Sequence, residues 1–316
     1  CIIIILGEPY STFSEILGKY FTKNKKIKRK ILIIGNIKLL RKQLSKLSYE
    51  INLNIVENYS QAKMNIINII DVDFKFNKIF SRITKNSKNY IEKSFDKALD
   101  IIHNNYENFL LINGPISKKD FLKKKYYGIT EYLSNKTKSK NEVMLIYNSM
   151  LSVSPITTHI PIKNVSKNIN KKIILNNVIK INNFYKEKLN KIPRFAILGL
   201  NPHCETTDNF SEEDKIIRPA IKYLKKKEIK VKGPFSADTF FIKKNIVNFD
   251  VVIGMYHDQV LTPLKTMYNF NAINITIGLP FIRISPDHGP NTSMIGENLS
   301  DPSSFFYAMK FLDKLK

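Results

Sequence analysis

The stretch at residues 251–259 reads VVIGMYHDQ, an apolar run that ends abruptly in polar residues. A short apolar run bounded by a turn is typical of a strand buried on both faces of a sheet. Comparable runs recur between longer amphipathic stretches, at residues 2–6, 31–34, 109–112, 153–156, 195–200 and 273–277. Buried strands that alternate with helical patterns predict an α/β fold in which helices flank a sheet.

Two of the amphipathic stretches have clear helical patterns. Between residues 91 and 102, apolar side chains recur at spacings of three and four, so they share one face of a helix. A second helix is expected to begin at Ser211, because Ser211 and Asp214 match a capping box. It should close at residues 225–227, where three lysines oppose the helix dipole favourably.

Length and composition limit the class of protein. With 316 residues, 43% of them hydrophobic, the chain is long enough for two domains or one large α/β unit. The first apolar run is too short to cross a bilayer and follows no basic region, so we expect neither a membrane span nor a signal peptide. The two cysteines, Cys1 and Cys204, exclude a disulfide framework and indicate a reducing compartment, the cytoplasm.

The net charge of +24 raises the question of a polyanionic partner. The 51 Lys and Arg residues are spread along the whole chain and mixed with abundant Ile and Asn. Lys, Ile and Asn have AT-rich codons, so a biased genome would enrich all three together. No basic motif interleaved with aromatic residues occurs. We therefore attribute the charge to composition and expect no nucleic-acid partner, although a positive field would favour a phosphorylated substrate.

Three of the five histidines, His159, His203 and His257, each follow the carboxyl end of a predicted strand. In open α/β sheets this edge is where ligands bind. Three neutral imidazoles that converge there would hold a divalent metal and leave room for substrate oxygens. A single histidine in this position would more often cap a helix or pack in the core, and no HExxH or CxxC pattern supports the site. The recurrence in one context favours the metal site.

A second group of residues suits an anionic substrate. Lys265 follows the His257 segment, Asn274 lies in the next predicted strand, and Arg283 lies among apolar residues. Arginine can bind phosphate or carboxylate through paired hydrogen bonds, whereas lysine acts as a point charge. His288, in the turn-rich segment SPDHG at residues 285–289, is either a cofactor contact or part of a plain turn.

Eight short segments together resemble the 4-hydroxythreonine-4-phosphate dehydrogenase family. They run along the chain in the family's order and are hallmark segments of it: GEP at residues 7–9, NGPI at 113–116, TTHIP at 157–161, LNPH at 200–203, ADT at 237–239, MYHDQ at 255–259, GLPFIR at 278–283 and DHG at 287–289.

The resemblance implies a two-domain fold like that of isocitrate and isopropylmalate dehydrogenases, each domain being a sheet flanked by helices. We expect a first domain at residues 1–133 plus 286–316. Residues 134–285 would form a second domain that carries most metal and substrate residues. The cofactor and active site would lie in the cleft between the two domains.

The resemblance also implies the site and its chemistry. A divalent metal, zinc, magnesium or cobalt, would be held by His159, His203 and His257 in a site shared across a homodimer. A small phosphorylated amino acid would be bound by four residues: Thr130, Lys265, Asn274 and Arg283. NAD or NADP would contact three residues: Asp238, Asp287 and His288. The reaction implied is oxidation of 4-phosphooxy-L-threonine followed by decarboxylation to 3-amino-2-oxopropyl phosphate; no general base is assigned.

The chain departs from the family pattern in its loops. Ile129 stands where the family has a substrate-binding histidine, so we expect that Ile129→His would restore a hydrogen-bond donor. Family glycines are replaced at residues 10–14 and 204–208 and at Val260, which restricts close backbone approach to a ligand. Two alternatives therefore stay open: a paralogue that oxidises another phosphorylated hydroxy acid, and a non-catalytic relic that binds metal or a polyanion.

Overall fold

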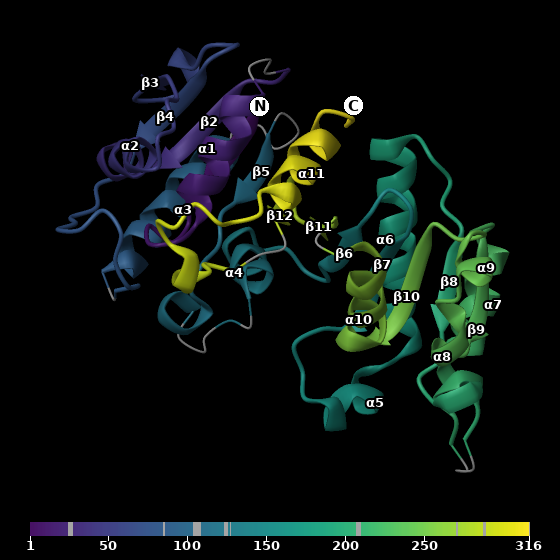
Figure 1. Ribbon diagram of the computed structural model, residues 1–316. Helices are drawn as coiled ribbons and strands as arrows, with labels where there is room; N and C mark the ends of the chain where they lie inside the picture. The colour runs from purple at the N-terminus through teal and green to yellow at the C-terminus, as the bar shows by residue number, and fades with distance from the viewer. Residues whose placement is uncertain are drawn as a thin grey trace. The chain divides into compact units, whose positions relative to one another are not determined.

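The structure, a computed structural model, describes residues 1–24, 28–84, 86–103, 109–122, 126, 128–206, 210–269, 271–286 and 289–315 (Figure 1). The chain divides into two compact units. Unit 1 comprises Cys1–Ser139 and Leu279–Lys314, and unit 2 comprises Lys140–Gly278 with Leu315. Unit 1 extends further than predicted at both boundaries: its first segment ends at residue 139 rather than 133, and its second begins at 279 rather than 286. As a result, α4 (Ile129–Lys136) and β12 (Ile282–Pro286) both belong to unit 1.

Unit 1 is built on a fully parallel sheet with the strand order β3-β4-β2-β1-β5-β12. Its elements, besides α4 and β12, are β1 (Ile2–Ile5), α1 (Phe13–Lys23), β2 (Ile31–Gly35), α2 (Ile37–Lys46), β3 (Leu53–Ile55), η1 (Tyr59–Gln61), β4 (Ile67–Asp71), α3 (Ser87–His103), β5 (Leu110–Asn113), η3 (Lys118–Leu122), η7 (Thr292–Met294) and α11 (Ser303–Leu312).

Unit 2 is built on a mixed sheet with the strand order β11-β6-β7-β10-β8-β9, in which the β11/β6 and β6/β7 pairs are antiparallel. Its elements are β6 (Val143–Tyr147), β7 (Ser152–Thr157), η4 (Ile162–Asn164), α5 (Val165–Asn168), α6 (Lys171–Leu189), β8 (Phe195–Leu198), η5 (Pro202–Cys204), η6 (Glu213–Ile217), α7 (Arg218–Lys226), β9 (Val231–Phe235), α8 (Ala237–Phe240), α9 (Lys243–Ile246), β10 (Val251–Tyr256), α10 (His257–Tyr268) and β11 (Ile273–Ile277).

Each sheet is covered by helices on both faces, so the predicted α/β class is confirmed (Figure 1). In unit 1, residues of β1 and β2 pack against α3, η3 and α4 on one face, while α1 and α11 pack together on the other. The rings of Phe13 and Phe305 join these two helices, with their centroids 5.6 Å apart. In unit 2, α10 packs on β7 and β10, and α6 packs on β6, β7 and β11. Strands buried on both faces must be apolar throughout, which explains the continuous runs in the sequence.

The two predicted helices are present. The apolar face between residues 91 and 102 belongs to α3, in which Ile91, Phe95 and Ala98 are buried. Ser211 caps the second helix as predicted, since its Oγ accepts a hydrogen bond from Asp214 N at 3.3 Å. This helix starts with the π-helical turn η6 before α7 and ends at Lys226. Among the described residues, no helix is long and apolar enough to cross a membrane.

A buried carboxylate stabilises the start of β10. Asp250 is 8% exposed and accepts hydrogen bonds from Lys191 Nζ at 2.8 Å and Arg194 Nε at 3.0 Å. Burial alone would raise its pKa, but the hydrogen bonds from Arg194 and Lys191 outweigh burial and lower the pKa of Asp250 to about 2. The carboxylate is therefore stabilised in the folded state.

Asp250→Asn should lower the free energy of unfolding by about 1–2 kcal/mol at neutral pH, a value reduced because both cations are about half exposed. Since the folded pKa lies below the ordinary value of 3.8, the stabilisation is present above that value and is lost as the pH falls towards 2. Urea denaturation at about pH 7 and pH 3 measures this difference. Asp214→Asn is the control, because its pair with Arg218 is exposed and should contribute under about 0.5 kcal/mol.

Candidate active site

The carboxyl ends of β7, β10 and β8 lie at one edge of the unit 2 sheet, because these neighbouring strands are parallel. His159 follows the last residue of β7 by two positions, and His257 is the first residue of α10, directly after β10. His203 lies in η5, five residues after the end of β8. The structure thus places all three histidines beyond the strand ends from which they were expected to extend.

Two of the three histidines lie together. The ring centroids of His159 and His257 are 6.0 Å apart, with 39° between the ring planes. With metal–nitrogen bonds of about 2.0–2.1 Å, two imidazoles on one ion have ring centres about 5–6 Å apart. His257 Nδ1 lies 2.7 Å from Asp258 Oδ1, which leaves Nε2 for another ligand. The spacing of these two rings fits two nitrogen ligands of a divalent metal, and a carboxylate orients one of them, His257.

His203 does not join this pair within one chain. Within the described part of the chain, no group of three or more His, Cys, Asp or Glu residues could hold a metal ion. His203 lies instead beside α8 and β9, with which η5 makes contact. Both His203 and Cys204 have left-handed backbone, with φ values of 56° and 60°. A single chain therefore supplies two of the three predicted ligands, and His203 as the third stays a prediction.

Arg283 is the best-defined part of the predicted substrate site. It lies in β12 of unit 1, not in the second domain to which the sequence assigned it, because Ile282–Ile284 pair in parallel with β5. The side chain is 4% exposed. Its Nε donates to Asn113 Oδ1 at 2.8 Å, and its Nη1 donates to Thr130 Oγ1 at 3.3 Å.

The Arg283 guanidinium is a buried charge. Burial lowers the pKa of Arg283 to about 10, an effect that nearby Glu131 partly opposes. The group is still charged at neutral pH, so a cation with little contact with water lies beside Asn113, the last residue of β5. A cation with little contact with water can bind an anion such as phosphate through paired hydrogen bonds, and here Glu131 lies close enough to act on the same guanidinium.

The other predicted substrate residues belong to unit 2. Lys265 is exposed in α10, eight residues or about 12 Å of helix rise beyond His257. Asn274 lies in β11, and its buried Oδ1 has no hydrogen-bond partner among the described residues. A buried oxygen without a partner is costly unless a ligand supplies a donor. Neither unit by itself brings all four predicted substrate residues together.

The predicted cofactor residues receive little support from the structure. Asp238 lies in α8, where its Oδ1 accepts a hydrogen bond from Thr239 N at 2.8 Å. Asp287 and His288 lie outside the described residues. These three assignments therefore stay predictions.

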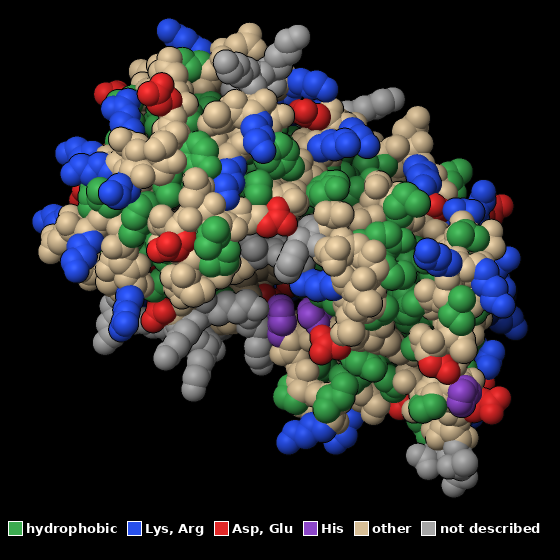
Figure 2. Space-filling view, viewed as in Figure 1, with side chains coloured by type: hydrophobic (Ala, Val, Ile, Leu, Met, Phe, Trp, Pro, Cys, Tyr) green, Lys and Arg blue, Asp and Glu red, His purple; other side chains and the backbone are tan. Residues whose placement is uncertain are grey.

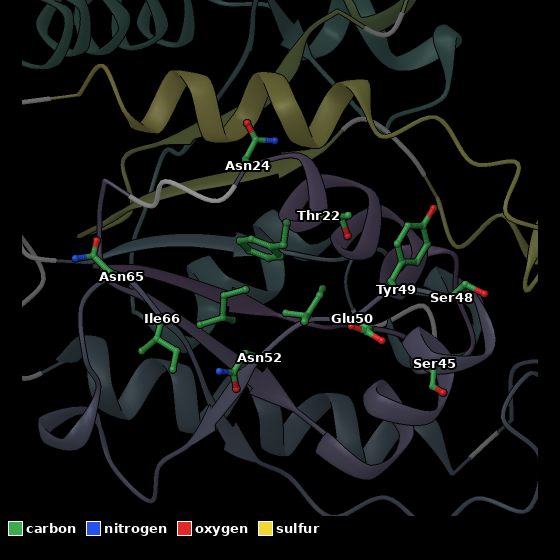
Figure 3. A pocket seen from close by; sticks show the side chains of 12 residues that line it. Thr22, Asn24, Ser45, Ser48, Tyr49, Glu50, Asn52, Asn65 and Ile66 are labelled. Carbon is green, nitrogen blue, oxygen red and sulfur yellow. The ribbon is translucent and has the colours of Figure 1, made fainter.

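A large pocket lies elsewhere in the fold. Its volume is about 930 Å³, and polar side chains such as Asn24, Asn52 and Asn65 line it (Figure 3). Residues 51–52 and 65–66 precede β3 and β4, so the pocket is at the amino ends of strands. None of the predicted site residues that the structure describes line it, and ligands of open α/β sheets bind at the opposite edge.

A family model described as pyridoxal phosphate biosynthetic protein PdxA matches residues 27–312. The chain belongs to this family. A relative from Sulfurihydrogenibium sp. (strain YO3AOP1) is 37% identical over 320 residues, covering 99% of this chain and 97% of the relative. One from Aquifex aeolicus (strain VF5) is 33% identical, covering 99% of this chain and 97% of its own. Both are named 4-hydroxythreonine-4-phosphate dehydrogenase, so the predicted family and its place among the dehydrogenases are confirmed.

Solved structures confirm the expected fold of this PdxA-family chain. The crystal structure of 4-hydroxythreonine-4-phosphate dehydrogenase from Klebsiella pneumoniae matches with a TM-score of 0.82 at 25% identity, covering 98% of this chain and 97% of that one. Isocitrate dehydrogenase from Methylococcus capsulatus matches with a TM-score of 0.50 at 10% identity, covering 99% and 84%. The second match concerns the fold alone and agrees with the expected isocitrate dehydrogenase-like architecture.

Two residues of this PdxA-family chain were quoted in motifs but not predicted as site residues. Asn113 ends β5 and orients Arg283; a polar residue at the end of an apolar run was the available signal. Glu8 follows β1 and is 2% exposed. Its Oε1 accepts hydrogen bonds from Ser87 Oγ at 2.8 Å and Tyr10 N at 3.3 Å, while Oε2 has no partner among the described residues.

Glu8 should make stability depend on pH. Burial raises the pKa of Glu8 to about 7 from an ordinary value of 4.5, although Ser87 and the Tyr10 backbone partly oppose this and Asp120 adds to it. Because the folded pKa is the higher one, the folded state favours the protonated carboxyl. Its stabilising contribution is present below 4.5 and is lost as the pH rises through 7.

Glu8→Gln should therefore gain about 2–4 kcal/mol relative to the unsubstituted protein when the pH is raised from about 5 to about 8. Urea denaturation at both pH values gives the four free energies of unfolding needed. Glu57→Gln, at an exposed position, is the control and should show no such gain. An equal response of both variants would mean that Glu8 is ionised in the folded protein at both pH values.

Proposed function

We propose that this chain catalyses NAD-dependent oxidation of 4-phosphooxy-L-threonine, followed by decarboxylation to 3-amino-2-oxopropyl phosphate, in pyridoxal 5'-phosphate biosynthesis. Membership of the PdxA family supports this pathway. The observation that carries the substrate assignment is the buried Arg283 guanidinium, held by Asn113 and Thr130 at a ligand-binding sheet edge. A fixed cation with little access to water suits a phosphate or carboxylate group.

We assign the substrate contacts as follows. Arg283 binds an anionic group of the substrate, with Thr130 beside it. Asn274 Oδ1, which lacks a donor, accepts a hydrogen bond from the substrate. Lys265 adds a point charge from α10. Binding energy from a phosphate distant from the reacting carbon can be used to orient that carbon for reaction.

We propose zinc, magnesium or cobalt as the divalent metal, with His159 and His257 as ligands and His203 as the third. When bound, such an ion supplies a Lewis acid that favours loss of a hydroxyl proton and later polarises a carbonyl group. NAD or NADP supplies the hydride acceptor. The chain's own part is to orient these groups. Asp258 forms a hydrogen bond with Nδ1 of His257, which fixes the ring and leaves Nε2 as the nitrogen that can bind the metal.

The test of the activity is reduction of NAD by the purified protein. Protein stripped with a chelator should form no NADH from 4-phosphooxy-L-threonine, and adding back zinc, magnesium or cobalt should restore the rate. 4-Hydroxy-L-threonine is the matched control substrate, because it differs only by the phosphate. Equal rates with both substrates would exclude Arg283 as a phosphate site. No rate with any of the three metals would exclude the proposed reaction.

We further propose a homodimer in which His203 enters the site of the partner subunit. In support, one chain brings only His159 and His257 together within its described residues. His203→Ala and His257→Ala proteins should each be inactive, but a mixture of their subunits forms heterodimers with one intact site. Statistical mixing should recover about a quarter of full activity. Recovery of none would place all three ligands within one chain.

We place the protein in the cytoplasm. Cys204 is a buried free thiol, which suits a reducing compartment. Lys and Arg side chains are spread over the face seen in Figure 2.

A further inference from the structure

Gln259, in the first turn of α10, connects the ends of two strands. Its Oε1 accepts a hydrogen bond from Met255 N at 2.7 Å, and its Nε2 donates to Gly199 O at 2.7 Å. Met255 lies in β10, two residues before His257, and Gly199 directly follows β8, four residues before His203. The Gln259 side chain therefore fixes the spacing of the two backbone segments that lead to these histidines.

Glu213 holds the next two peptide groups on the way to His203. Its side chain is fully buried. Oε1 accepts hydrogen bonds from Leu200 N at 2.7 Å and Asn201 N at 2.9 Å, and Oε2 accepts one from Asn201 Nδ2 at 2.9 Å. Hydrogen bonds to an ionised acceptor are the strong ones. Together with Gln259, Glu213 binds three consecutive backbone positions, 199 to 201.

This segment needs such support because of its backbone. His203 and Cys204 are consecutive residues in the left-handed region, which residues other than glycine rarely adopt. A strained conformation persists only where the surrounding structure determines it. The hydrogen bond that Gln259 donates to Gly199 O, and those that Glu213 accepts from Leu200 N and Asn201 N, fix residues 199–201, shortly before this turn.

Thr157 makes the corresponding connection for the remaining histidine. It is the last residue of β7, two positions before His159. Its Oγ1 donates a hydrogen bond to Met255 O at 2.8 Å. Met255 is thus bound through its carbonyl to the His159 strand and through its N–H to Gln259. A continuous series of side-chain to backbone hydrogen bonds crosses the sheet edge from β7 through β10 to β8.

We infer, on the basis of the proposed metal site, that Gln259, Glu213 and Thr157 are positioning residues that hold the three histidine-bearing segments in place for metal binding. None of the three is itself a ligand. They act on the backbone that leads to His159, His203 and His257, each through hydrogen bonds with main-chain N–H or C=O groups. Side chains that orient metal ligands in this way commonly affect metal affinity.

Binding of Co²⁺ to the purified, metal-stripped full-length protein tests this inference. Gln259→Leu keeps the side-chain bulk and removes both hydrogen bonds. Its Kd for Co²⁺ should rise about 10- to 100-fold, and the visible absorption of bound Co²⁺ should change because the coordination geometry is altered. A merely structural glutamine would not affect that spectrum.

Gln43→Leu is the matched control. Gln43 in α2 is 3% exposed, and its Nε2 donates to Pro9 O and Ile79 O, both at 3.0 Å, but it lies in unit 1. This variant should lose stability while its Kd for Co²⁺ stays within about twofold, since distant sites behave independently. Thr157→Val, which loses one hydroxyl, should raise the Kd about three- to tenfold and applies even if Gln259→Leu does not fold.

The outcomes are distinguishable. If Gln259→Leu, or Thr157→Val in its place, binds Co²⁺ with unchanged affinity and spectrum, the positioning role is overturned although the metal site stands. If His257→Ala binds Co²⁺ with the same Kd as the unsubstituted protein, the proposed metal site itself is wrong, and the positioning role is overturned with it. An equal rise in Kd for Gln43→Leu and Gln259→Leu would show a general loss of stability and would also overturn the inference.

Discussion

Replacing Arg283 with methionine should lower kcat/KM for 4-phosphooxy-L-threonine by about 2–5 kcal/mol, the usual loss on truncating one partner of a buried charge pair. This corresponds to about 30- to 4,000-fold. Methionine keeps the bulk of the side chain but removes the charge and the donors to Asn113 and Thr130. Steady-state kinetics with NAD measures the effect, and thermal unfolding separates it from loss of fold.

A second variant, Arg283→Lys, tests whether the geometry of the arginine side chain matters as well as its charge. Arg283→Lys keeps a cation but not the paired geometry, so its efficiency should lie between those of Arg283→Met and the unsubstituted protein. Arg41→Met, at an exposed position in α2, controls for the general loss of positive charge. If Arg283→Met retains full efficiency, the anion of the substrate binds elsewhere.

Replacing Ile129 with histidine should lower the free energy of unfolding by about 3–5 kcal/mol. The sequence favoured this substitution as a gain, because the family has histidine here. The structure instead places Ile129 in the hydrophobic core of unit 1, 7% exposed and in one cluster with Phe95, Phe121 and Tyr132. Histidine would lose about 1.5–3 kcal/mol of apolar burial and place a polar ring without a partner, at about 1–3 kcal/mol.

Urea denaturation measures this loss, with Ile55→His as the control. Ile55 is 55% exposed in β3 of the same unit, so the same substitution there should change stability by under about 0.5 kcal/mol. If Ile129→His folds with normal stability and raises kcat/KM, the pocket has kept room for the family's histidine. The buried position of Ile129 also explains why the chain tolerates isoleucine where the family has histidine, because Ile129 packs in the hydrophobic core of unit 1.

Most of the apolar strands could be predicted from the sequence because both of their faces are buried, but β6, which is apolar throughout, was missed. Polar residues weaken the pattern: β11 was predicted although it contains Asn274, whereas β4 and β12 were missed. β4 contains Asn68, which is fully buried and receives hydrogen bonds from Asn54 Nδ2 and Lys63 N, both at 2.9 Å. These partners satisfy the amide, so a polar side chain occupies a position that the pattern reserves for apolar ones. β3 and β9 were missed for a related reason: the first has three residues, and the second contains Gly233 and Pro234.

For the site, the sequence could predict position along the chain but not contacts. Each histidine was placed correctly after a strand, because strand ends follow from local pattern. That His159 meets His257 depends on β7 and β10 being neighbours, which is a long-range pairing. The same holds for Arg283 and Asn113, which are 170 residues apart and meet only because β12 pairs with β5. Single-sequence patterns carry no such information.

The route of the chain through unit 1 has a consequence for its synthesis. Unit 1 is assembled from Cys1–Ser139 and Leu279–Lys314, so β12 and α11 leave the ribosome only after all of unit 2. Until then, the edge of β5 has no β12 partner, and Phe13 lacks the ring of Phe305. A nascent chain in this state presents an unpaired strand edge and apolar surface, both of which promote association with other chains. Ribosome-bound fragments that end before β12 should therefore require chaperones, whereas a chain that includes β12 pairs it with β5.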